Sequence, residues 1–197
     1  SFEYRAGPMN QPTQFSPLEA QLALVEFVPR LKSLIFDLNG AESRHLTLGV
    51  TNWVLSSLAG LKELRTLEVD TRCLVPHANP MVWVYQTRWE WDMPPELEPA
   101  VESGPVPPVS DGALVELLPE SICELKIVQG SHGPGPEGLE VAFGVLATEA
   151  GRFPSLREVR MEVRVEDGWD GENGVRMAFE VRGVRFVVDA MAELPLD

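Results

Sequence analysis

A short pattern of apolar residues, apolar-x-x-apolar-x-apolar, recurs in four segments of this chain, which begin at Leu31, Leu64, Ile122 and Leu156. The last two apolar positions of each segment alternate with other residues, as in a strand that is buried on one face. Three of the four segments have a proline just upstream, where proline marks a turn without removing a hydrogen-bond donor from the sheet. Each segment is therefore predicted to enter a strand from a turn.

The spacing of these segments indicates an internal repeat. Leu31 and Leu64 are 33 residues apart, and Ile122 and Leu156 are 34 apart. Leu64 and Ile122 are 58 apart, which is one period plus an insertion of 24. Repetition of one supersecondary unit at a fixed period is the sequence signature of solenoid proteins.

The start of the chain fits the same period. Phe2 and Tyr4 precede Leu34 and Phe36 by 32 residues. The chain is therefore expected to begin inside a repeat, and residues 1–197 are predicted to be a single repeat domain from a longer protein.

Between the strand segments, apolar residues recur at spacings of three, four and seven, as on the buried side of a helix. Helices are predicted over residues 17–28, 46–61, 111–118 with Asp111 as N-cap, 138–153, and 175–182 with Gly183 as a left-handed end. A last strand is predicted over residues 184–188. Such alternation implies the α/β class, with parallel strands lying side by side in chain order.

Three parts of the chain resemble a known family, namely Leu118–Ile127, Phe153–Val159 and Phe179–Phe186. They resemble the leucine-rich-repeat region of fungal F-box-type proteins. The resemblance implies a leucine-rich-repeat-like solenoid, with one parallel strand and one helix per repeat and a long insertion in the middle. It also implies that the repeats recognise a substrate. Binding to a Skp1-type adaptor of a ubiquitin ligase is expected only if an F-box lies ahead of residue 1.

The residues between the buried strand positions are expected to point away from the core and to form one face. Acidic residues outnumber basic ones there, since only Lys126 and Arg160 are basic. The acidic residues are Asp37, Glu68, Asp70, Glu124, Glu158 and Glu162. Because parallel strands lie about 4.8 Å apart, they are predicted to form a continuous acidic patch. The patch is interpreted as a docking surface for a basic segment of a protein partner, or else as the solvated face of an acidic protein.

The insertion, residues 74–110, is rich in proline and tryptophan. It holds Trp83, Tyr85, Trp89 and Trp91 within nine positions. Exposed aromatic residues on a loop are strong anchors for a partner, so these four are predicted to bind it. The alternative is a loop whose rings pack over one end of the core.

The charge balance excludes two classes of partner. The chain has 30 acidic and 16 basic residues, for a net charge of −14. Nucleic acid and anionic membrane surfaces would be repelled by this charge, and no segment is long and apolar enough to span a bilayer. The two cysteines, Cys73 and Cys123, are expected to be free thiols. A reducing, intracellular location in the cytoplasm or nucleus follows.

No catalytic site, metal site or cofactor is predicted, because no histidine lies beside a cysteine or acidic residue at metal-ligand spacing. We therefore interpret the chain as a non-catalytic protein–protein recognition module rather than an enzyme. Two alternatives stay open. One is a hydrolase with a site in the insertion, using Asp92, Glu96 or His77, and the other is a purely structural repeat segment.

Overall fold

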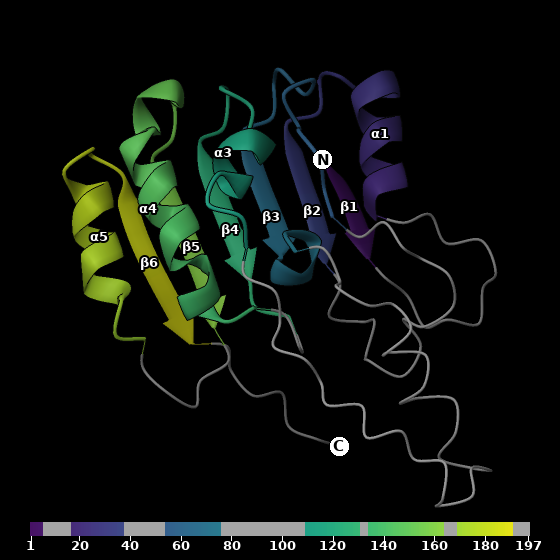
Figure 1. Ribbon diagram of the computed structural model, residues 1–197. Coiled ribbons are helices and arrows are strands. Elements are labelled where there is room, and N and C mark those ends of the chain that lie inside the picture. Colours follow the sequence, from purple (N-terminus) through teal and green to yellow (C-terminus); the bar gives the residue numbers. More distant parts are fainter. Residues whose placement is uncertain (6–16, 38–53, 76–108, 131–133, 164–168, 191–197) are drawn as a thin grey trace, which may run out of the picture.

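The computed structural model describes residues 1–5, 17–37, 54–75, 109–130, 134–163 and 169–190. Its centre is a six-stranded sheet in which every strand is parallel to its neighbours and the strands follow in chain order (Figure 1). The strands are β1 (Phe2–Arg5), β2 (Ser33–Asp37), β3 (Thr66–Asp70), β4 (Glu124–Val128), β5 (Glu158–Val163) and β6 (Arg185–Ala190). The chain is therefore an α/β protein, and the predicted strand order is confirmed.

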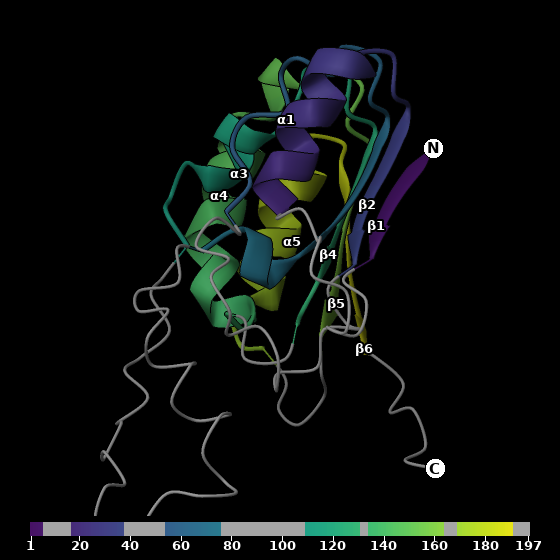
Figure 2. The ribbon, with the colours of Figure 1, turned by 90° about the vertical axis from the view of Figure 1, so that its right-hand side faces the viewer.

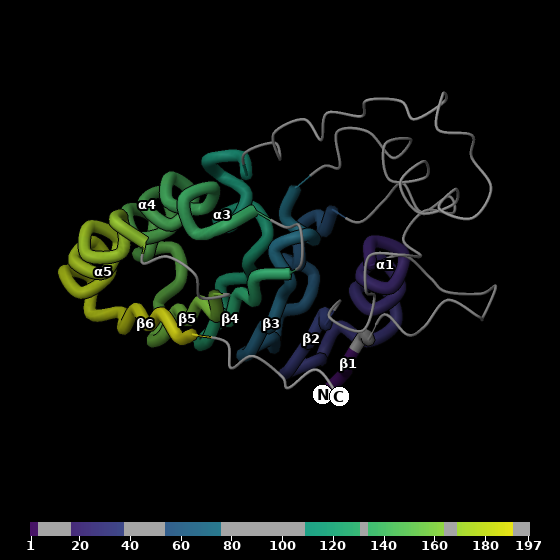
Figure 3. The backbone as a smooth tube through the Cα atoms, turned by 90° about the horizontal axis from the view of Figure 1, so that it is seen from below, coloured from purple at the N-terminus to yellow at the C-terminus, as the bar shows by residue number. Residues whose placement is uncertain are grey.

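The described helices all cover the same face of the sheet, as the edge-on views show (Figures 2 and 3). The α-helices are α1 (Pro17–Phe27), α3 (Ala113–Leu117), α4 (Glu140–Thr148) and α5 (Glu172–Glu180). Short 3-10 helices are η1 (Thr71–Cys73), η3 (Pro136–Leu139) and η4 (Ala150–Arg152). Among the described elements, none covers the opposite face, which we call the open face.

The predicted ladder of buried apolar residues is confirmed and forms the core between the sheet and the helices. The register pairs Leu34 with Leu67 and Phe36 with Val69, and it continues across β4 and β5. Eight ladder residues are at most 1% exposed: Leu34, Phe36, Leu67, Val69, Leu125, Ile127, Val159 and Met161. Phe2 pairs with Leu34, as the 32-residue spacing predicted.

The same backbone turn precedes four of the strands. A backbone N–H donates to the carbonyl three residues earlier at Leu31, Leu64, Ile122 and Leu156, with N···O distances of 3.0, 3.0, 3.1 and 2.9 Å. These four side chains are buried. The first apolar position of each segment therefore closes a turn, and the strands begin two residues later than the segments do.

The helix predicted over residues 46–61 is wrong in the part that the structure describes, residues 54–61, which form turns and irregular chain. Leu58 and Leu61, expected on the buried side of that helix, are buried, and so is Leu55. However, the N–H of Leu55 donates to the Cys73 carbonyl and that of Leu58 to the Leu117 carbonyl. Carbonyls of neighbouring segments thus accept from N–H groups that, in a helix, would donate to the carbonyl four residues earlier.

The ends of two other helices test the predicted caps. Helix α3 begins after Gly112, which makes no side-chain capping bond, so Asp111 as N-cap is wrong. Gly183 follows α5 at a φ of 73°, a conformation that glycine adopts without a steric penalty. The N–H of Val184 donates to the Phe179 carbonyl at 3.1 Å, which completes the predicted left-handed end.

Candidate protein-binding interface

The open face presents rows of side chains that run across the strands. The first row holds Ser33, Thr66, Glu124, Glu158 and Arg185. The second holds Ile35, Glu68, Lys126, Arg160 and Val187. Beyond them, Glu162 lies beside Asp189. Because adjacent strands are about 4.8 Å apart, charged side chains within and between these rows come into contact.

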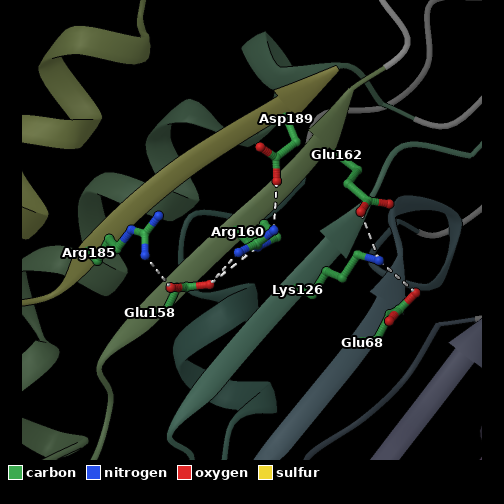
Figure 4. Close-up of polar contacts among 7 residues, drawn as sticks. All are labelled: Glu68, Lys126, Glu158, Arg160, Glu162, Arg185 and Asp189. Carbon is green, nitrogen blue, oxygen red and sulfur yellow. Dashed lines mark hydrogen bonds and ion pairs between the residues drawn. The ribbon is translucent and has the colours of Figure 1, made fainter. Parts of the chain in front are cut away.

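Lys126 lies in the centre of the open face and joins two strands through ion pairs (Figure 4). Its Nζ is 3.3 Å from Oε1 of Glu68 and 2.9 Å from Oε1 of Glu162. Partial burial lowers the pKa of Lys126, but its hydrogen bonds and charge interactions with Glu162 and Glu68 outweigh this and raise it above its ordinary value. Lys126 therefore stays charged and compensates both carboxylates in part.

Arg160 forms the second cluster. Its Nε and Nη2 donate to Oε1 of Glu158 at 3.2 and 2.9 Å, and its Nη1 donates to Oδ2 of Asp189 at 2.9 Å. Nη1 of Arg185 is 3.4 Å from the other Glu158 oxygen. The hydrogen bond and charge of Glu158, helped by Asp189, raise the pKa of Arg160. The acidic side chains of the open face are thus joined with its cations in a network of paired charges.

The carboxylate of Glu124 differs from the other acidic groups of the open face. It is exposed, and within the described residues no ion pair or hydrogen bond engages its side chain. It borders a shallow hollow of about 290 Å³ whose lining includes Ser33, Thr66, Glu68 and Lys126. The negative charge left uncompensated on this face is therefore concentrated near β4.

Asp70 does not lie on the open face, which corrects the prediction that it belongs to the docking surface. It is 1% exposed and forms an ion pair with Arg72, itself 3% exposed. The strand alternation ends at Asp70 because the chain turns into η1, where the Asp70 carboxylate accepts the Arg72 N–H at 2.8 Å. Asp37, the last residue of β2, is half-buried.

The predicted aromatic anchors Trp83, Tyr85, Trp89 and Trp91 lie outside the described residues. So do His77, Asp92 and Glu96 of the alternative hydrolytic site. Of the insertion, Leu74, Val75, Val109 and Ser110 are described, and the three apolar residues are buried. Their burial places both ends of the insertion against the core.

In the described parts of the chain, no group of three histidine, cysteine or acidic residues could hold a metal ion. None of the described helices has the length and hydropathy of a membrane span. Cys73 and Cys123 are both free, and Cys73 is buried.

Sequence reasoning missed Arg185 and Asp189, which extend the charge network onto β6. The signal was present, because the predicted strand over 184–188 places Arg185 in the same row as Glu158. Asp189 lies one residue past that predicted strand, so its contact could not be inferred. Comparisons with protein families, with curated proteins and with solved structures find no match to this chain.

Proposed function

We propose that this chain is a non-catalytic recognition module that binds a protein partner through the open face of its sheet. The observation that carries the proposal is the charge of that face on strands β2 to β6, where six carboxylates outnumber three cations. The carboxylates are those of Asp37, Glu68, Glu124, Glu158, Glu162 and Asp189, and the cations are Lys126, Arg160 and Arg185. Such a surplus attracts a basic segment of a partner and repels acidic competitors.

A leucine-rich-repeat-like solenoid is the architecture that we propose for the chain. Two observations support it: the same turn before β2, β3, β4 and β5, and the in-register pairing of consecutive strands. A solenoid that stacks repeats side by side leaves its strand face available as an extended binding surface.

The resemblance to fungal F-box-type proteins extends the proposal to the role of a substrate receptor in a cytoplasmic or nuclear ubiquitin ligase. In that role, the open face would select a basic substrate. A Skp1-type adaptor would bind a separate F-box. Co-precipitation of the adaptor by the full-length natural protein tests this extension.

Comparative capture from the source cell tests the proposed interface. The bait is the full chain, either unchanged or with Glu68→Gln, Glu124→Gln and Glu158→Gln combined. A matched control combines Glu116→Gln, Glu149→Gln and Glu180→Gln, which removes three exposed carboxylates from the helical side. Since exposed ion pairs contribute only about 0–1 kcal/mol each, both triple variants are expected to fold, and circular dichroism checks this.

The expected result is a protein that the unchanged chain and the helical-side control retain but the open-face variant loses. Its retention should fall with added salt, because exposed charges are screened over about 8 Å at physiological ionic strength. Equal retention by all three baits would contradict docking at the open face.

A further inference from the structure

Three basic residues occupy equivalent positions at the amino edge of the sheet, each directly before a strand. Lys32 precedes β2, Arg65 precedes β3 and Arg157 precedes β5, while Cys123 holds the position before β4. Backbone hydrogen bonds of 2.8 Å join them in order, from the Arg65 N–H to the Lys32 carbonyl, from Cys123 to Arg65, and from Arg157 to Cys123. We call Lys32, Arg65 and Arg157 the amino-edge row.

The amino-edge row differs from the basic residues of the open face. Its three side chains are exposed, and within the described residues none forms an ion pair with a carboxylate. In contrast, Lys126, Arg160 and Arg185 all pair with acidic residues. The chain has 30 acidic and only 16 basic residues. Neighbouring cations without an ion-pair partner are therefore unexpected in it, and a bound anion would supply one.

We infer that the amino-edge row is a second docking surface, which takes an acidic, extended segment of a protein partner. Arginine presents a planar fork of donors that fits a carboxylate in a bidentate manner. The Arg65 side chain lies along the row, since its Nη1 is 3.7 Å from Sγ of Cys123. A segment that crosses from Arg65 to Arg157 would therefore cover Cys123.

The spacing of the row indicates the kind of segment that fits. Arg65 and Arg157 are separated by two strand spacings, which is about 9.6 Å. In a polyproline II segment, residues three apart lie on the same side of the chain and are separated by about 9.3 Å. A segment with acidic residues at every third position would thus place one carboxylate at each arginine as it crosses the strand starts. Such a segment has the opposite charge to the basic partner of the open face, so the two inferences stand separately.

Alkylation of Cys123 provides a local test, because this half-buried thiol lies within the row while Cys73 is buried. The probe is the synthetic peptide acetyl-Glu-Pro-Pro-Glu-Pro-Pro-Glu-amide, and its glutamine counterpart is the control peptide. The glutamate peptide should slow the reaction of Cys123 with iodoacetamide in the full chain, and the glutamine peptide should not. The concentration dependence of protection gives the dissociation constant.

The variant Arg65→Gln/Arg157→Gln should weaken protection by about tenfold, as expected for the loss of two exposed ion pairs. The matched control Lys126→Gln/Arg160→Gln removes two positive charges from the open face and should protect Cys123 as the unchanged chain does. The inference is overturned by equal protection from both peptides, by equal losses in both double variants, or by inorganic phosphate protecting as well as the glutamate peptide does.

Discussion

The carboxylate of Asp70 holds the side chain of Arg72 through two hydrogen bonds, and both side chains are buried. Nε of Arg72 donates to Oδ1 at 2.9 Å, and Nη2 donates to Oδ2 at 2.6 Å. The same carboxylate also accepts the Arg72 backbone N–H. One carboxylate therefore fixes the corner where β3 passes into η1.

Replacement of one partner of this ion pair should destabilise the fold strongly. Asp70→Asn leaves the Arg72 guanidinium buried without a counter-charge, a change that typically costs about 3–5 kcal/mol. Chemical denaturation of the unchanged chain and the variant measures the difference.

The double variant Asp70→Asn/Arg72→Met removes the unpaired positive charge of Arg72 together with the carboxylate of Asp70. It should recover part of the stability that Asp70→Asn loses. If the single variant is as stable as the unchanged chain, the ion pair does not hold the corner.

Gly130 lies directly against the buried ion pair. Its N–H donates to Oγ1 of Thr71 at 3.3 Å, and a Cβ at this position would overlap Nε of Arg72 and the Asp70 carboxylate. Gly130→Ala should therefore destabilise the chain by about 1–3 kcal/mol, the usual cost of overpacking.

Gly144 provides the control for this substitution. It lies within helix α4, and a Cβ there would meet no atom within 4 Å. Gly144→Ala should stabilise the chain by up to about 1 kcal/mol, because alanine is the better helix former. Equal effects of the two alanine substitutions would contradict the close contact at Gly130.

How far the sequence predicts this fold depends on which forces set each feature. The alternation of Leu67 and Val69 predicts a strand, because burial on one face of a sheet demands a period of two. The spacing of Leu58, Leu61 and Leu64 is ambiguous, since consecutive turns present side chains at intervals that also suit a helix. Long-range hydrogen bonds to Cys73 and Leu117 favour turns over a helix here, and no local sequence pattern reveals such bonds.

The open face shows the same limit. Which residues lie on it follows from the alternation of buried and outward-facing positions along each strand. Glu68, Glu124 and Glu158 could therefore be placed on the open face from the sequence alone. Asp70 could not be placed correctly, because its burial depends on a bidentate contact with Arg72. Arg72 comes two positions later, where the chain has already left the strand. The pairing of Lys126 with carboxylates on both adjacent strands requires the strand register across the insertion, which the repeat period predicts. It also requires particular side-chain conformations, which the period does not predict.

The two cysteines should react at very different rates. Burial, followed by the charge of Asp70, raises the pKa of the Cys73 thiol well above its ordinary value, and Arg72 offsets this only in part. The thiolate is the reactive form, so Cys73 should resist alkylation in the folded chain, whereas half-buried Cys123 should react. Mass spectrometry should find one modified thiol under native conditions and two in denaturant. Two modified thiols under native conditions would mean that Cys73 is accessible.

The raised pKa of Cys73 also makes stability depend on pH in the alkaline range. The folded thiol keeps its proton where the unfolded thiol, with a pKa of about 8.5, loses it. The folded state then binds more protons, so the free energy of unfolding should fall as pH rises, by up to about 1.4 kcal/mol per unit from this group. Lys126 adds little to this slope between about pH 8.5 and 10, because its stabilising charge persists below the unfolded lysine pKa of about 10.4. A Cys73→Ala variant with an unchanged slope would contradict the assignment.

The rates of binding should separate the two surfaces that were predicted to contact a basic partner. Replacement of Glu68, Glu124 and Glu158 by glutamine should mainly slow association, because exposed charges steer the encounter more than they hold the complex. Trp83→Ala, in the insertion, should mainly speed dissociation, since a buried aromatic anchor governs the lifetime of a complex. Surface plasmon resonance with the partner identified by comparative capture gives both rate constants, and the association rate should fall with added salt only where Glu68, Glu124 and Glu158 are intact. If the triple variant changes neither rate, the open face does not steer the partner.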